Sequence, residues 1–179
     1  MHIKFLMIAR VLYDKGYTEY VNAAKITHEK YPEVEFQLLG KIDEVYPFHV
    51  PEKVVREDEN RGAIKYLGVS SNVQPIIEIA DCIVLPSYHE GLSRVLIEAL
   101  AMGKPIITSN IPGCKETVED GKNGFLVTPK SSKELAEAFF KFISLSEEMR
   151  FKMGKYSRDK AENEFDIKNV INIYRKITG

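Results

Sequence analysis

With 179 residues, 44% of them hydrophobic, the chain is long enough to bury a core of its own, and one domain is expected. Its 25 lysines and arginines nearly balance its 26 aspartates and glutamates, which excludes a broad basic surface for nucleic acid, so any anion-binding site must be local. The two cysteines, Cys82 and Cys114, form no C-x-x-C pair and no histidine cluster accompanies them, which argues against a disulfide framework or a metal site and indicates a reducing compartment, the cytoplasm. No signal-peptide pattern opens the chain, and no stretch has the roughly 20 apolar residues that cross a bilayer, so we expect a soluble protein.

Apolar runs typical of strands alternate with segments of helical periodicity. Strands are predicted at 3–9, 34–39, 63–67, 81–86, 105–108 and 125–127. Helices are predicted at 17–31, 73–80 and 92–102, and the polar segment 43–61 has the composition of a loop with room for one short helix. From Ser132 onward three helices are predicted: one that opens at Ser132, a second that Ser146 caps and that reaches about residue 163, and a third that Asp166 caps and that ends at residue 178.

This alternation predicts the fold class. Strands and helices joined by short connections form right-handed βαβ units, and these build a doubly wound parallel sheet, a Rossmann-like α/β architecture. Open sheets of this kind bind ligands at the carboxyl ends of their strands. The polar and glycine positions expected at that edge are Arg10 and Lys15 after the first strand, Gly40, Gly68, residues 89–93 and residues 110–115.

Two glutamates, Glu90 and Glu98, stand eight residues apart where the fourth strand passes into a helix. Glu90 is predicted on the turn before the helix and Glu98 two turns inside it, about 12 Å further along the axis, which is the span of a sugar diphosphate. The backbone amides of Gly91, Leu92 and Ser93 are expected to point out of the helix start, where the positive end of the helix dipole favours an anion. Glu90 can accept hydrogen bonds from hexose hydroxyls, and Glu98 can accept both hydroxyls of a ribose. A helix-start charge and a solvated glutamate would explain the same spacing.

Arg10 and Lys15 are expected to flank the same diphosphate and to supply the positive charge that the glutamates lack, although plain solvated loop charges would also explain them. Rival nucleotide motifs are absent, since no G-x-G-x-x-G follows the first strand and no G-x-x-x-x-G-K-[ST] occurs. His89 is expected to be a packing residue or to support the site from outside it, rather than to act as a general base. Tyr66 and Tyr88 are expected to be core or pocket wall.

The string from Glu90-Gly91-Leu92-Ser93 to Glu98, continued by residues 99–105, resembles the E-x7-E signature of the family 4 retaining glycosyltransferases, which have the GT-B fold. Further elements of that family are similar and occur in the same order: Arg10 with Lys15-Gly16, Tyr66-Leu67-Gly68, residues 80–87, residues 111–116 and residues 121–127.

The resemblance implies transfer of a sugar from a nucleoside diphosphate donor, commonly a UDP-sugar, with no metal and no other cofactor. Glu90 would be the catalytic residue, orienting the hexose and stabilising positive charge at its anomeric carbon, and the departing diphosphate would be stabilised electrostatically. The implied donor contacts are Arg10 and Lys15 for the diphosphate, Glu98 for the ribose, Glu90 with the backbone of Gly91, Leu92 and Ser93 for the hexose, and the backbone of Tyr66, Leu67 and Gly68 for the base.

Two departures from the family pattern qualify this reading. Residues 69–72 lack the acidic residue that often follows the third-strand glycine, and the chain has room for only one half of a GT-B enzyme. Residues 1–165 would be the donor-binding domain, and the helix in 166–179 would cross to a missing N-terminal acceptor-binding domain. The isolated half is therefore expected to be inactive.

The full enzyme would act on a glycan or lipid-linked acceptor in surface polysaccharide biosynthesis, with at most peripheral membrane association. The alternatives are a non-catalytic nucleotide-sugar-binding module or a relative of sugar-nucleotide epimerases.

Overall fold

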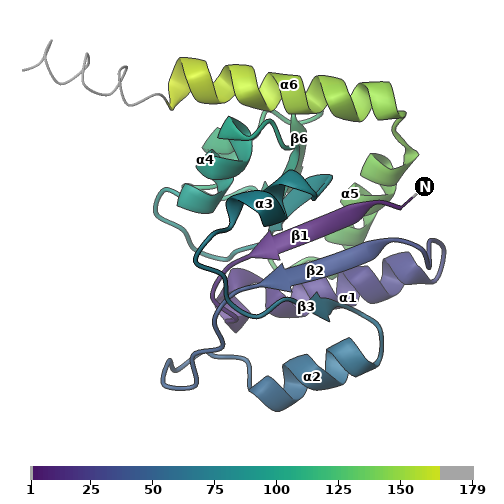
Figure 1. The fold of residues 1–179 in the computed structure, drawn as a ribbon, viewed down its shortest axis with the longest axis vertical. Helices are drawn as coiled ribbons and strands as arrows, with labels where there is room; N and C mark the ends of the chain where they lie inside the picture. The colour runs from purple at the N-terminus through teal and green to yellow at the C-terminus, as the bar shows by residue number, and fades with distance from the viewer. Residues whose placement is uncertain (1, 166–179) are drawn as a thin grey trace, which may run out of the picture.

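The structure, a computed structural model, describes residues 2–165 (Figure 1). Its strands are β1 (Lys4–Ile8), β2 (Glu35–Leu39), β3 (Lys65–Tyr66), β4 (Cys82–Leu85), β5 (Ile106–Ser109) and β6 (Gly124–Val127). Its α-helices are α1 (Tyr17–His28), α2 (Glu52–Asn60), α3 (Gln74–Glu78), α4 (Arg94–Ala101), α5 (Ser132–Ser144) and α6 (Glu147–Glu164), and short 3-10 turns occupy η1 (Tyr13–Lys15) and η2 (Lys115–Thr117). No helix within residues 2–165 has the length and apolar character needed to span a membrane.

The strands form one sheet in the order β3-β2-β1-β4-β5-β6, and every neighbouring pair is parallel. The chain builds outward from β1 to β3, returns to the centre, and then builds outward in the other direction from β4 to β6. The order therefore reverses between β1 and β4, and in open α/β sheets the crevice beside such a reversal is where ligands bind. The predicted doubly wound parallel α/β fold is confirmed.

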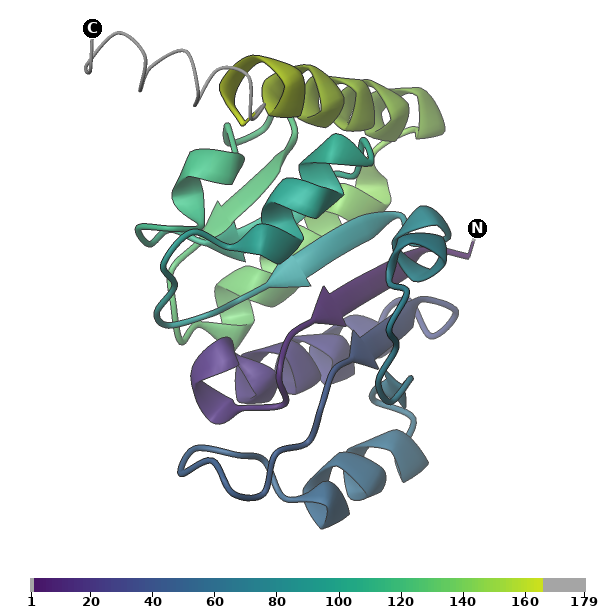
Figure 2. The same cartoon turned by 60° about the vertical axis from the view of Figure 1, so that its left-hand side comes forward.

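Helices cover both faces of the sheet, as Figure 2 shows with α1 and α5 behind the strands and α3 and α4 in front. On the first face, Phe5 of β1 packs against Phe36 of β2 and Phe139 of α5, with ring centroids 5.2 and 4.5 Å apart. On the second face, Leu6 of β1 lies in a separate buried cluster with residues of α3 and α4 such as Leu96. The side chains of consecutive β1 residues are thus buried on opposite faces of the sheet, which explains why the strand is an almost uninterrupted apolar run.

The strand predicted at 63–67 is the one that differs most, since β3 contains only Lys65–Tyr66. The chain before it is held by α2 instead of by the strand ladder: the Ala63 amide donates to the carbonyl oxygen of Asp58 (3.0 Å), and the Tyr66 amide donates to the Glu59 carboxylate (2.9 Å). Apolar character alone therefore overestimated this edge strand.

Helix ends agree with the predicted capping residues. Ser146 caps α6 by accepting a hydrogen bond from the Met149 amide (3.2 Å). The helix predicted to open at Ser132 does begin there, and the preceding Ser131 is its cap. Helix α1 ends at His28 instead of Tyr31, and the amides of Lys30 and Tyr31 both donate to the carbonyl oxygen of Thr27 (3.1 and 2.8 Å) in the turn that closes it. The third C-terminal helix, predicted to follow a cap at Asp166, lies outside the described residues.

Candidate functional site

An ion pair joins Lys15 and Glu90 at the carboxyl edge of the sheet, with 2.6 Å between Nζ and Oε1. Lys15 ends the turn η1 that follows β1, and Glu90 lies in the loop between β4 and α4. The pair therefore sits beside the reversal of strand order. The two side chains are only 20% and 14% exposed, so water screens their attraction less than it would on an open surface.

The turn that carries Lys15 is fixed to the end of β4. The backbone carbonyl of Asp14 accepts hydrogen bonds from the Tyr88 amide (2.8 Å) and from the Ser87 hydroxyl (3.3 Å). Gly16 follows with φ of 83°, and a Cβ at that position would stand 2.1 Å from the carbonyl oxygen of Pro86. Only glycine fits both this dihedral angle and this approach, so Gly16 lets the first loop reach the fourth strand.

The start of α4 is partly covered by the loop that follows β5. The Ser93 amide donates to the carbonyl oxygen of Gly113 (3.2 Å), and the Gly113 amide donates to the Glu116 carboxylate (2.8 Å). The expectation that the Ser93 amide is unpaired is therefore wrong for this structure. The reason is Gly113, whose φ of 87° lets the loop come so near that a Cβ there would lie 1.5 Å from the carbonyl oxygen of Gly91. In residues 2–165 the amides of Gly91 and Leu92 have no hydrogen-bond partner.

Arg10 lies at the same edge but contacts neither member of the ion pair. Its guanidinium Cζ is 4.6 Å from the centroid of the Tyr46 ring, which belongs to the loop after β2. That loop is tied to the chain after β1, since the Tyr13 amide donates to the carbonyl oxygen of Phe48 (3.0 Å). The Arg10 side chain is exposed, and stacking on a ring face leaves its N–H groups available for a ligand.

Glu98 is exposed on α4 and lines a cavity of about 360 Å³. The same cavity is lined by residues 71–74, which follow β3, and by Ala101 and Met102 at the end of α4. The structure thus brings Glu98 beside the segment after the third strand, and the residues that line this cavity include neither Lys15 nor Glu90.

The segment predicted to line a base is held within the fold through most of its polar groups. The Tyr66 hydroxyl donates to the carbonyl oxygen of Gly40 (2.8 Å), and the Leu67 amide donates to that of Leu38 (2.8 Å). The Gly68 carbonyl accepts from the Gly40 amide (2.8 Å), while the Gly68 amide has no partner in the part of the chain that the structure describes. Gly68 is therefore the position of this segment from which a backbone donor is available.

Tyr88 has contacts that the sequence did not indicate. Its hydroxyl donates to both carboxylate oxygens of Glu19, at 2.7 and 2.8 Å, and Glu19 is a 7% exposed residue of α1. Burial, followed by the hydrogen bond to Glu19, raises the pKa of Tyr88 well above its ordinary value, so the hydroxyl remains a donor. The ammonium of Lys130, after β6, lies 4.9 Å from the centroid of the Tyr88 ring. No sequence pattern pointed to this set, because glutamate on a helix is ordinarily solvated.

Both cysteines are buried and free. Burial raises the pKa of Cys114 from its ordinary 9.0 to about 11, with a smaller opposing effect from its hydrogen bond with Thr108. Its thiol is therefore protonated at neutral pH, which agrees with assigning it no nucleophilic role. Within residues 2–165 no group of three or more His, Cys, Asp or Glu side chains is placed to hold a metal ion.

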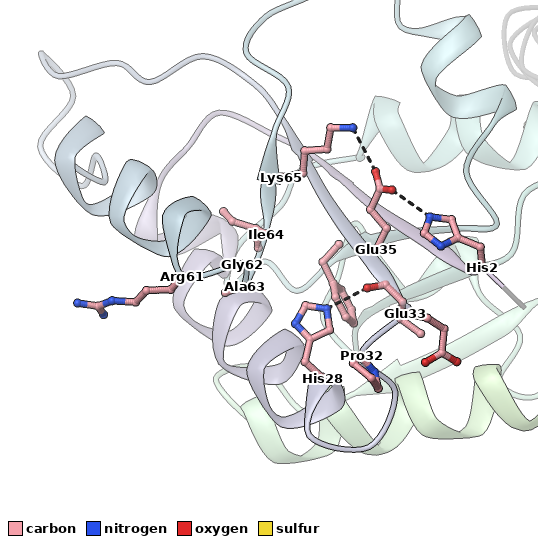
Figure 3. A pocket seen from close by; sticks show the side chains of 12 residues that line it. His2, His28, Pro32, Glu33, Glu35, Arg61, Gly62, Ala63, Ile64 and Lys65 are labelled. Atoms are coloured by element: carbon pink, nitrogen blue, oxygen red, sulfur yellow. Dashed lines mark hydrogen bonds and ion pairs between the residues drawn. The ribbon is translucent and has the colours of Figure 1, made fainter.

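A larger cavity, of about 630 Å³, opens at the opposite edge of the sheet (Figure 3). It lies at the amino ends of β2 and β3, where Glu35 bridges His2 (3.1 Å) and Lys65 (3.7 Å), and His28 contacts the backbone carbonyl of Val34 (2.9 Å). None of the residues predicted for the functional site lines it. Because Glu35 is paired within the fold and no predicted site residue contributes to the lining, we assign this surface hollow no function.

Comparison with known proteins gives the family. Residues 1–160 match the family model for glycosyl transferases group 1. The chain is 34% identical over 150 residues to the N,N'-diacetylbacillosaminyl-diphospho-undecaprenol alpha-1,3-N-acetylgalactosaminyltransferase of Campylobacter jejuni, a match that covers 84% of this chain and 38% of that protein. It is 30% identical over 167 residues to the capsular polysaccharide biosynthesis glycosyltransferase CapM of Staphylococcus aureus, covering 88% of this chain and 41% of CapM. The chain thus spans less than half the length of these relatives.

Among solved structures, HepE from Anabaena in complex with UDP superposes with a TM-score of 0.86 at 23% identity, over 99% of this chain and 49% of HepE. TarM superposes with a TM-score of 0.85 at 19% identity, over 97% of this chain and 34% of TarM. At these identities the likeness shows the fold, which is the Rossmann-like fold of GT-B glycosyltransferases. On the family match and on the similarity to the Campylobacter enzyme, the chain belongs to the glycosyl transferases group 1 family.

Proposed function

We propose that this chain is the donor-binding half of a family 4 retaining glycosyltransferase. The enzyme transfers a hexose or N-acetylhexosamine from a nucleoside diphosphate sugar, with a UDP-sugar as the expected donor, to a glycan or lipid-linked acceptor in surface polysaccharide biosynthesis. The observation that carries the proposal is the Lys15–Glu90 pair, which places a cation and a carboxylate side by side at the strand-order reversal, 2.6 Å apart. The HepE complex with UDP and the names of the Campylobacter and Staphylococcus relatives support the donor and acceptor classes.

The diphosphate lies against the Lys15 ammonium and the start of α4. An ammonium has three N–H donors, and the bond to Glu90 uses one of them, so Lys15 can bind phosphate oxygens while it holds the carboxylate. The partnerless amides of Gly91 and Leu92 add donors near the positive end of the helix. The stacked guanidinium of Arg10 reaches the same anion from the other side of the crevice.

Glu90 faces the hexose. Its second carboxylate oxygen accepts hydrogen bonds from sugar hydroxyls, and its negative charge stabilises the positive charge that develops at the anomeric carbon as the diphosphate departs. The leaving diphosphate gains charge in the same step, and Lys15 and Arg10 offset that charge. Catalysis is therefore electrostatic, and Glu90 is assigned no nucleophilic role.

The nucleoside end of the donor extends toward Glu98. The cavity of about 360 Å³ between Glu98 and residues 71–74 receives the ribose, whose two hydroxyls the carboxylate accepts. The base lies along the end of β3, where the amide of Gly68 offers a donor. Ser71, Asn72 and Gln74 supply the polar groups of this wall in place of the acidic residue that is absent from positions 69–72.

The acceptor requires a second domain, which the relatives' additional length can supply. We therefore propose that this half alone does not transfer sugar, that the full enzyme acts in the cytoplasm with at most peripheral membrane association, and that the cations of the site make a metal unnecessary. Two free, buried cysteines accord with a reducing compartment.

The alternative is a nucleotide-sugar-binding module without catalysis, or a relative of sugar-nucleotide epimerases with the same architecture. Incubation of UDP-GlcNAc with the chain, followed by proton NMR of the anomeric signals, separates these functions. We expect no turnover by the chain alone, and transfer with an unchanged anomeric configuration once the acceptor-binding half of a relative is fused before it. An epimer formed by the chain alone, or inversion by the fusion, would overturn the proposal.

A further inference from the structure

Tyr88 forms hydrogen bonds with the chain on both sides of Lys15. Its backbone amide donates to the carbonyl oxygen of Asp14 (2.8 Å), the residue before Lys15. Its hydroxyl donates to both oxygens of Glu19 (2.7 and 2.8 Å), in the first turn of the helix that follows Lys15. Glu90 is two residues after Tyr88 in the chain. Tyr88 therefore ties the chain on both sides of Lys15 to the loop that carries Glu90, through its backbone amide at Asp14 and its side chain at Glu19.

The hydroxyl contact has no substitute. Glu19 is 7% exposed, and the Tyr88 hydroxyl is its one hydrogen-bond donor within residues 2–165. A buried carboxylate needs a hydrogen-bond donor, so the bond between the Tyr88 hydroxyl and Glu19 is favoured at one position of the Tyr88 ring. The connection that Tyr88 makes to Glu19 is therefore rigid, and rigidity is what a residue needs in order to position its neighbours.

A third loop closes over the ring. The Lys130 ammonium lies 4.9 Å from the ring centroid, and Lys130 is the one non-glycine residue among residues 2–165 with a positive φ, at 63°. This left-handed conformation is uncommon for a side chain such as lysine and directs the loop after β6 onto the ring. Loops from β1, β4 and β6 thus converge on Tyr88.

We infer that Tyr88 is a positioning residue for the donor site, which fixes the separation of Lys15 and Glu90 through its hydroxyl bond to Glu19. The inference rests on the proposed function, because it assigns to Tyr88 the geometry on which diphosphate binding depends. Tyr88 itself touches no donor atom in this account.

The test compares Tyr88→Phe with the unaltered chain in calorimetric titrations with UDP. Removal of the hydroxyl is expected to weaken UDP binding about tenfold, because the Lys15–Glu90 pair loses its fixed geometry. Tyr156→Phe is the control for loss of a tyrosine hydroxyl, since Tyr156 of α6 also donates to a glutamate, Glu119, and neither residue is a predicted donor contact. That control is expected to bind UDP as the unaltered chain does.

Two further variants separate positioning from stability. Glu19→Gln added to Tyr88→Phe removes the unpaired buried charge, so it is expected to restore the melting temperature but not the UDP affinity. In a Lys15→Met background, Tyr88→Phe is expected to weaken binding by less than twofold, because the two changes act through the same pair.

If the unaltered chain does not bind UDP, the proposed function fails before Tyr88 is tested. If it binds UDP and Tyr88→Phe binds equally well, or if affinity returns together with the melting temperature in the double variant, Tyr88 is only a structural residue and the inference is wrong. Full additivity of Tyr88→Phe with Lys15→Met would also overturn it.

Discussion

Lys15 and Glu90, 75 positions apart in the chain, form the shortest link between the two loops that flank the reversal of strand order, with 2.6 Å between ammonium nitrogen and carboxylate oxygen. Each was predicted to touch a different part of the donor, the diphosphate and the hexose. Under the proposed function, their contact brings these two parts of the donor together at the bond that a glycosyltransferase breaks.

Lys15→Met tests the cation. The change removes a charged donor to the diphosphate, so UDP affinity is expected to fall about 10- to 100-fold, equivalent to about 1.5–3 kcal/mol. The partly buried Glu90 also loses its partner, and the free energy of unfolding in urea is expected to fall by about 1–3 kcal/mol. Lys25→Met is the control, because Lys25 pairs with Asp58 at 2.8 Å on α1 and α2, away from the site. It should lose stability and keep UDP affinity; equal losses of affinity in both variants would contradict the assignment.

Gly113→Ala tests the contact between the loop after β5 and the start of α4. A Cβ at residue 113 would lie 1.5 Å from the Gly91 carbonyl oxygen, so the loop must move and the Ser93 amide must lose its partner. We expect a loss of at least about 2 kcal/mol in unfolding free energy, together with altered UDP affinity. Gly121→Ala is the matched control, since it has a similar φ of 79° but open space at its Cβ. Equal stability of the two variants would show that the contact is not formed.

Glu98→Ala tests the ribose assignment. The carboxylate lines the cavity beside residues 71–74, so its removal is expected to weaken UDP binding about tenfold. Binding of inorganic pyrophosphate, which has no ribose, should change by less than twofold in the same calorimetric experiment. Glu137→Ala, an exposed position of α5, should alter neither ligand. A parallel loss of pyrophosphate affinity in Glu98→Ala would place the carboxylate near the phosphates instead.

The cysteines give a prediction about pH. Burial raises the pKa of Cys114 from 9.0 to about 11, so the folded state keeps its proton where the unfolded state loses it. The stability contributed by Cys114 is therefore fully present below pH 9 and is lost as the pH rises from about 9 to about 11. At pH 8 a thiol reagent should label neither cysteine in the folded chain and both in urea. Rapid labelling of the folded chain would contradict the burial of these thiols.

Removal of metal ions tests whether the side chains and amides of the site are enough to bind the diphosphate. Lys15, Arg10 and the free amides at the start of α4 are proposed to supply the positive potential that the diphosphate requires. The dissociation constant for UDP should then agree within twofold in EDTA and in millimolar Mg²⁺. A dependence on Mg²⁺ of tenfold or more would mean that these side chains do not suffice.

The fold was largely predictable because its signals are local. Nearly continuous apolar runs such as that of β1 identify strands buried on both faces, and serines such as Ser146 mark where helices begin. The edge strand β3 was overestimated, since whether residues 63 and 64 join a ladder depends on groups that α2 offers to them.

For the site, the sequence predicts which residues lie at the carboxyl edge of the sheet, but not which of them contact one another. Topology brings Lys15 and Glu90 to the same crevice, but their ion pair depends on Gly16, which allows the first loop to approach β4. The covered Ser93 amide depends likewise on the approach of Gly113. The buried bond from Tyr88 to Glu19 could not be anticipated, because the sequence pattern of a helix does not reveal which polar residue of its first turn faces inward.

The most direct test of the account is a calorimetric titration of the chain with UDP, repeated with Lys15→Met, Glu98→Ala and Lys25→Met. We predict saturable binding at one site, weakened at least tenfold by each of the first two substitutions and unchanged by the third. A folded chain that does not bind UDP, or that binds it equally well in all four forms, would contradict the assignment of this edge of the sheet as a nucleotide-sugar site.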